Sequence, residues 1–145
     1  MARRVIRSII GVLLGIIALN AFGGGVYGML GAEGIPVTWL EGSPFYSYFI
    51  PSLILFLVVG GLSLAAAVAV LSHSHHAHGL VTTAVAVIFI WLAVQISIIG
   101  YVSWMQPAVA ITAFIILVLA LVPAGVLHRH EARPSAGAPK GESAQ

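Results

Sequence analysis

Long uncharged, apolar runs separated by short polar links dominate the pattern along the chain. No charged residue lies between Arg7 and Glu33, and none lies between Glu41 and Arg129. A transmembrane helix needs about 20 consecutive, mostly apolar residues, so the first run is long enough for one crossing and the second for three. We predict an all-α, four-helix transmembrane bundle over residues 1–128, with spans at about 8–30, 48–71, 80–104 and 108–127.

The composition supports a membrane protein rather than a water-soluble one. Of the 145 residues, 60% are apolar and 7% are charged, and the mean hydropathy is +1.09, whereas about 25% of an ordinary soluble domain is charged. The chain has no cysteine, which excludes disulfides, thiolate metal sites and cysteine nucleophiles. The net charge of +2 is too small for a nucleic-acid surface. The partner that the composition indicates is the lipid bilayer.

The first span admits two interpretations. A basic start, here Arg3, Arg4 and Arg7, followed by apolar residues is also typical of a cleaved secretory signal. The apolar core of such a signal is only about 7 to 15 residues long and ends at a small-residue cleavage site. Here the uncharged run continues as far as Leu30 without a clear site of that kind. We therefore favour an uncleaved transmembrane helix.

The links and the tail carry local signals of their own. The link at 31–47 is too polar to cross a bilayer, and Ser43 followed by Pro44 is typical of an N-cap and a first helical residue. Pro51 would then lie in the interior of the second helix, where it removes a backbone hydrogen bond and bends the helix. The tail at 129–145, rich in Ala, Pro, Gly, Ser and charge, is predicted to be disordered.

The distribution of basic and aromatic residues predicts the orientation. With four crossings, all the basic residues fall on one side, and basic residues favour the cytoplasmic side. They are Arg3, Arg4, Arg7, Arg129, Arg133 and Lys140. The tyrosines and two of the tryptophans then fall near the outer interface, which amphipathic rings prefer. They are Tyr27, Tyr46, Tyr48, Tyr101, Trp39 and Trp104. We expect both termini to be cytoplasmic.

The link at 72–79 is rich in histidine. It holds His73, His75, His76 and His78, and the predicted topology places His128 and His130 at the same end. Imidazole is a common ligand of zinc, copper and nickel, so these four side chains are candidate metal ligands. The alternative is a polar loop that binds Zn²⁺ or Ni²⁺ only adventitiously, because no carboxylate within the loop orients the imidazoles. We expect no resident cofactor.

Two amides are the most conspicuous polar groups at membrane depth. Asn20 lies near the middle of the first span and Gln95 near the middle of the third, and none of the four spans contains Asp, Glu, Lys, Arg or His. That absence argues against a proton-coupled pump built from this chain alone. The amides either line a small polar cavity or form an interhelical hydrogen bond, which contributes about 0.6 kcal/mol and at most about 2. We favour the hydrogen bond.

Small residues four positions apart indicate close helix packing. Such pairs occur at Gly11 and Gly15 in the first span, Gly61 and Ala65 in the second, and Ala93 and Ser97 in the third. No catalytic or phosphate-binding motif is present. We therefore expect a non-enzymatic protein that acts as an accessory subunit of an unidentified membrane partner or as a homo-oligomer. The alternative is a small transporter or channel with a polar path near the two amides and a cytoplasmic histidine loop that senses metal or pH.

Three segments carry a resemblance to known proteins: WLEGSPF at 39–45, PSLIL at 51–55 and IIGYVSWMQP at 98–107. The chain resembles, over about residues 5–127, a group of small bacterial four-span integral membrane proteins of uncharacterised function. The resemblance implies a location in a bacterial plasma membrane and supplies no activity, substrate or site.

Overall fold

Four long helical segments run up and down through the structure. This computed structural model describes residues 2–101 and 103–131, with side chains as far as Val122. The first crossing is α1 (Ala2–Met29), the third is α4 (Ala77–Ile99) and the fourth is α5 (Met105–Glu131). The second crossing is continuous but composite: α2 (Phe49–Ile54), the π-helix η2 (Leu55–Gly60) and α3 (Gly61–Leu71). The prediction of an all-α protein with four helices long and apolar enough to span a membrane is confirmed.

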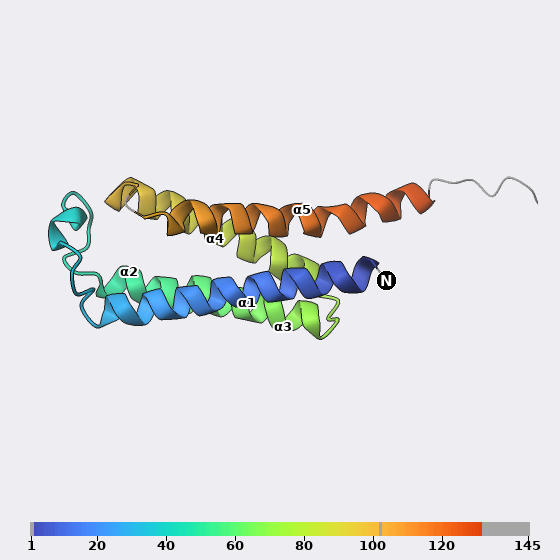
Figure 1. The fold of residues 1–145 in the computed structure, drawn as a ribbon, viewed down its shortest axis with the longest axis horizontal. Coiled ribbons are helices and arrows are strands. Elements are labelled where there is room, and N and C mark those ends of the chain that lie inside the picture. The colour runs from blue at the N-terminus through green and yellow to red at the C-terminus, as the bar shows by residue number, and fades with distance from the viewer. Residues whose placement is uncertain (1, 102, 132–145) are drawn as a thin grey trace, which may run out of the picture.

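The four segments form a ring in which each packs against two neighbours. α1 lies antiparallel to the second crossing along its whole length, and α4 runs obliquely between that pair and α5 (Figure 1). α5 returns beside α4 and also contacts α1, whereas α1 and α4 lie diagonally opposite each other across the ring. We call the end that holds Arg3, Arg4 and the histidine loop the basic end. The opposite end, which holds Tyr27, Tyr48 and the 3₁₀ helix η1 (Val37–Leu40), is the aromatic end.

The bundle is tightly packed from its middle to the basic end, where Ile10, Val70 and Val81 are also buried. Leu14 of α1, Ile88 of α4 and Ile116 of α5 are fully buried in one apolar core. Buried alanines at Ala66 and Ala84 let the backbones approach, and dispersion then provides the attraction that lipid does not provide by hydrophobic exclusion.

Several helix boundaries differ from the predicted ones, and the first helix begins at Ala2 rather than at about residue 8. The third span ends at Ile99 instead of residue 104, because Gly100 adopts φ 80° and ψ −170° and leaves the helical region. The fourth span starts earlier than predicted, at Met105, and continues to Glu131. Residues 129–131 are therefore helical, not disordered, and the rest of the predicted disordered tail lies outside the described residues.

The predicted N-cap at Ser43 and the bend at Pro51 were wrong, although the second helix begins within one residue of the predicted position. Ser43 does not cap a helix: its Oγ donates to the carbonyl of Leu40 at 2.7 Å and accepts from the amide of Phe45 at 3.3 Å, which closes a turn. The helix begins at Phe49, so Pro51 is its third residue. The first helical amides have no intrahelical acceptor, and a proline there removes no helix hydrogen bond.

The distortion of the second crossing lies further along, at the π-helix η2. This segment ends at the pair Gly60–Gly61, and glycine pairs lower the cost of departing from α geometry. The Phe22 ring of α1 covers Gly60 so closely that a Cβ there would lie 2.7 Å from it. Phe22 also contacts Phe56, with ring centroids 4.8 Å apart. The π-turns therefore belong to the α1 interface, and π-segments occur often at functional sites.

Candidate functional site

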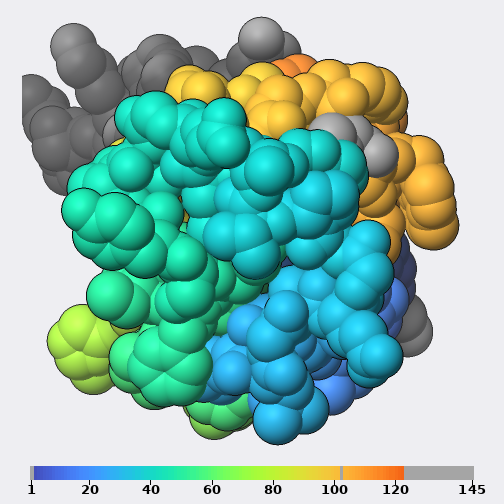
Figure 2. Space-filling view, turned by 90° about the vertical axis from the view of Figure 1, so that its left-hand side faces the viewer, coloured from blue at the N-terminus to red at the C-terminus, as the bar shows by residue number. Residues whose placement is uncertain are grey.

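The aromatic half of the bundle is hollow. A cavity of about 510 Å³ lies between α1, the second crossing, α4 and the start of α5. It exists because α1 and α4 diverge here and because small residues, Ala21, Gly24 and Gly28, face it from α1. The link between α1 and α2, coloured blue to cyan in Figure 2, lies over much of this end of the bundle.

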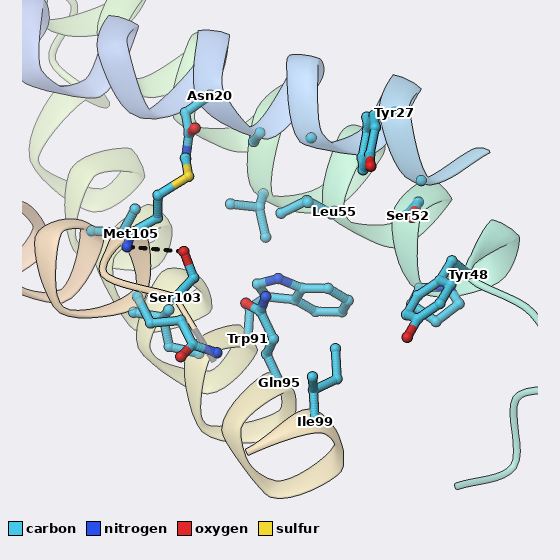
Figure 3. Close-up of a pocket in the computed structure, with 18 of the residues that line it drawn as sticks. Asn20, Tyr27, Tyr48, Ser52, Leu55, Trp91, Gln95, Ile99, Ser103 and Met105 are labelled. Atoms are coloured by element: carbon cyan, nitrogen blue, oxygen red, sulfur yellow. Dashed lines mark hydrogen bonds between the residues drawn. The ribbon is translucent and has the colours of Figure 1, made fainter. Parts of the chain in front are cut away.

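Asn20 and Gln95 both line this cavity, and both are half-buried. They reach it from different walls, Asn20 from α1 and Gln95 from α4 (Figure 3). The predicted hydrogen bond between them is not formed, because the cavity separates the two helices that carry them. In Figure 3 the Met105 side chain points toward Asn20. The arrangement is the polar cavity that the sequence left as the second interpretation.

Trp91 is the most informative residue that the sequence reasoning missed. It lies one turn before Gln95 on α4 and lines the same cavity, and its Nε1 is buried without a hydrogen-bond partner. A buried donor left unpaired costs about 1–3 kcal/mol. One signal was present in the sequence: Trp39 and Trp104 fall at the predicted interface, whereas Trp91 falls in the middle of a span, where an indole N–H has no water.

Tyrosines attach the α1–α2 link to the helix ends beside the cavity. The Tyr27 hydroxyl donates to the carbonyl of Glu33, and the Tyr48 hydroxyl donates to the carbonyl of Pro36 at 2.7 Å. Burial raises the pKa of the Tyr48 phenol above its usual value, so the group stays protonated and remains a donor. These contacts hold the link across the aromatic end.

The turn between α4 and α5 closes another side of the cavity. Gln106 is buried, and its Nε2 donates to the carbonyl of Gly100 at 3.2 Å. Ser103 accepts from the amide of Met105 at 3.2 Å. Ser52, buried on α2, also lines the wall. The polar groups around the cavity are thus amides, hydroxyls and the indoles of Trp39 and Trp91.

No Asp, Glu, Lys, Arg or His is among the residues that line the cavity. An anion or cation placed there would lose its hydration without gaining a counter-charge, which is costly in a membrane interior. Amides, hydroxyls and an indole bind neutral hydrogen-bonding groups instead, and they provide no acid or base that titrates near neutral pH.

A second hollow adjoins the first on the other side of Trp91. This groove of about 380 Å³ lies between the π-helical segment and α4, and apart from Trp91 and Gln95 its lining is apolar. Residues Val58, Ile90 and Val94 line it and are 45%, 64% and 41% exposed on the outer surface of the bundle. The two hollows share five lining residues, namely Pro51, Val59, Trp91, Gln95 and Ile99.

The histidine loop lies at the basic end, far along the helices from the cavity. His73 has φ 59°, and its Nδ1 lies 3.1 Å from the carbonyl of Leu71, while the rings of His75 and His76 lie 3.9 Å apart. In the part of the chain that the structure describes, no group of three or more His, Cys, Asp or Glu side chains is placed to hold a metal ion.

The other histidines of the proposed cluster are described to different extents. His78 lies in the first turn of α4, whereas the side chains of His128 and His130 lie outside the described residues. Metal binding by the loop stays a prediction.

Comparison with protein families, with curated proteins and with solved structures finds no match. The fold and the site therefore define a class rather than a family. The chain is a multi-pass helical membrane protein with an uncharged, partly polar cavity in one half of its bundle.

Proposed function

We propose that this chain is a non-enzymatic protein of the bacterial plasma membrane that binds a small neutral molecule in the cavity between α1 and α4. The observation that carries the proposal is the cavity itself, about 510 Å³ in volume and lined by Asn20, Gln95 and Trp91 without any charged side chain. Ligand sites in proteins are typically clefts or cavities of about 300–1,000 Å³ that are mostly apolar and hold a few polar groups.

The packing of the basic half favours a binding protein or an alternating-access carrier over an open channel. Leu14, Ile88 and Ile116 are at most 1% exposed and fill the middle of the bundle, where Ile88 also forms part of the cavity wall. A continuous water path through this state would have to pass that dry core. Transport by such a protein therefore requires the two helical pairs to move relative to each other, as in rocking carriers.

A residue that fills the cavity provides the test. Gly24 lines the cavity, and a Cβ there would meet only the Leu55 side chain, at an ordinary 3.5 Å. We expect Gly24→Phe to fold and to reduce the bound molecule per chain about tenfold or more, because overlap with a packed ring costs a ligand about 1–3 kcal/mol. The measurement is mass spectrometry of solvent extracts from protein purified in native lipid discs.

Gly23→Phe is the matched control. Gly23 is the preceding residue on the same helix, is exposed and has nothing within 4 Å of a Cβ. This variant should keep the full amount of the molecule. The proposed function is contradicted if no small molecule co-purifies with the parent. It is also contradicted if Gly24→Phe and Gly23→Phe carry equal amounts of that molecule per chain.

The proposed location and orientation rest on charge and resemblance. The described basic residues Arg3, Arg4 and Arg7 lie at the basic end together with the histidine loop, as expected of a cytoplasmic face. Arg7 also donates from Nε and Nη2 to the carbonyl of Val70, at 3.4 and 3.2 Å, and so caps the end of α3. The cavity then lies in the outer half of the membrane. The resemblance described above indicates a bacterial plasma membrane.

A second function is favoured by the outward face of α4. Small, exposed residues recur there with alternating spacings of four and three. They are Gly79, Thr83, Ala86, Ala93 and Ser97, with Ile90 completing the stripe. The hydroxyls of Thr83 and Ser97 are satisfied within the helix. Such stripes are enriched where membrane helices meet. They support a homo-oligomer, or an accessory subunit that contacts a partner through α4.

Substitution within the stripe tests this second function. We expect the parent to be dimeric or larger by light scattering in mild detergent, and Ala93→Leu to be monomeric, because the larger side chain separates the backbones at the contact. Ala65→Leu is the control, since Ala65 is an exposed alanine on the second crossing. A monomeric parent that purifies without a partner, or an oligomer that Ala93→Leu leaves intact, counts against an interface on α4.

A further inference from the structure

We propose that the molecule in the cavity is a lipid with a neutral, carbonyl-bearing head group whose chain lies in the groove beside α4. This inference rests on the proposed function and names the class of ligand. It is carried by the position of Trp91, which lies between a partly polar cavity and an apolar groove that opens on the outer surface of the bundle.

The polar lining of the cavity and the apolar lining of the groove match the two parts of an amphipathic molecule. The cavity provides amide and indole groups from Asn20, Gln95 and Trp91, whereas the groove provides aliphatic side chains such as Val58 and Val94. The groove also reaches the α1–α2 link at Leu40 and Phe45, so it extends from the aromatic end into the membrane. A chain in the groove stays beside the surrounding acyl chains, while its head group enters the bundle from the side.

Two features of the cavity indicate the chemistry of the head group: the absence of charged lining residues and the unpaired indole N–H of Trp91. The lining has no charged residue, so a phosphate or an ammonium group would be unpaired there. The Nε1 of Trp91 is a donor without a partner, and an indole N–H is a donor only. In Figure 3 the nitrogen-bearing edge of the indole faces the Leu55 side of the cavity. A carbonyl oxygen that displaces the end of the Leu55 side chain satisfies this N–H.

Nuclear magnetic resonance of the indole groups tests the proposal directly. The chain has three tryptophans, so a ¹⁵N-labelled sample gives three indole N–H signals, and Trp91→Phe assigns the one in question. Two probes present the shared chemistry: a benzoquinone carrying a decyl chain, and dioctanoylglycerol with its ester carbonyls. We expect one or both to move the Trp91 proton downfield in a saturable manner while the signal of Trp104, which is 75% exposed, stays in place.

Variants in the groove distinguish the contribution of the lipid chain to binding from that of the head group. Val94→Phe fills the groove and is expected to weaken binding of the decyl quinone about tenfold, because several buried methylenes lose their contacts. A benzoquinone without the decyl chain should bind equally to Val94→Phe and to the parent. Ile96→Phe is the matched control, since Ile96 is exposed on the same helix and lines neither hollow. It should leave the binding of both quinones unchanged.

Three results would overturn the proposal: no saturable shift of the Trp91 signal with either probe, an equal shift with anionic dioctanoyl phosphatidylglycerol, or equal effects of Val94→Phe and Ile96→Phe. Each result is distinguishable from failure of the proposed function. A molecule whose amount depends on Gly24 but which is charged, or which has no carbonyl or no chain, refutes the lipid and leaves the cavity as a binding site.

Discussion

Gly25→Leu is expected to lower the free energy of unfolding by about 3 kcal/mol, at the upper end of what overpacking usually costs. A Cβ at Gly25 would lie 2.7 Å from Cβ of Phe56, 3.2 Å from its Cα and 3.0 Å from the carbonyl oxygen of Ser52. Two of these neighbours are backbone atoms and none is the free end of a side chain. The only relief is to separate α1 from the second crossing, which loses the dispersion contacts that hold this pair together.

The measurement is denaturant unfolding in mixed micelles, with Gly23→Leu as the matched control. Gly23 lies on the same helix and has nothing within 4 Å of a Cβ, so its substitution should change the stability by no more than about 0.5 kcal/mol. Equal stability of the two variants would mean that α1 does not approach the second crossing at Gly25. Gly24, Gly28 and Leu55 flank that approach and line the cavity, so the shape of the candidate site would change with it.

Single cysteines at the two ends of the bundle are expected to give all-or-none labelling in intact cells. The chain has no native cysteine, so each introduced thiol is the only target. Tyr46→Cys lies in the α1–α2 link, where Tyr46 is 96% exposed, and should react fully with a membrane-impermeant maleimide added outside. His75→Cys, in the exposed loop before α4, should react only after the cells are permeabilised. The physical reason is the preference of basic residues for the cytoplasmic face.

The inverse pattern, with His75→Cys labelled from outside and Tyr46→Cys protected, would mean that the protein has the opposite orientation in the membrane. The cavity would then open toward the cytoplasmic leaflet, and the source of its ligand would change with it. Labelling of both positions from outside would contradict the crossing of the second segment. A denatured sample of each variant controls for the reactivity of the thiol.

The four crossings were predictable from the sequence, whereas the end of α4 and the effect of Pro51 were not. The four crossings follow from solvent preference alone, because a long apolar run without charges is stable only among acyl chains. The end of α4 was missed, since nothing local distinguishes Gly100 from the glycines that continue helices elsewhere in the chain, and only its φ of 80° stops the helix. The effect of Pro51 likewise depends on where the helix starts: the start at Phe49 lies within one residue of the predicted one, so Pro51 falls in the first turn and does not bend the helix interior.

The candidate site was predictable only in part. Asn20 and Gln95 stood out because polar groups are rare at membrane depth, but their relation to each other depends on the distance between α1 and α4. That distance depends on the oblique course of α4 (Figure 1), and the wall that α1 forms with the second crossing depends on the close contacts at Gly25 and Gly60. Both contacts lie between segments far apart in the chain, which a local pattern does not record.

The sequence by itself determined that this protein is an all-helical bundle with four membrane-length helices, because transfer of charge-free segments into lipid is a local property of each segment. Only the tertiary structure decided that one half of the bundle is packed and the other hollow, and that the indole of Trp91 faces the hollow half unpaired. Packing is a relation between segments, so neither the cavity nor its unpaired donor exists until the four helices are assembled.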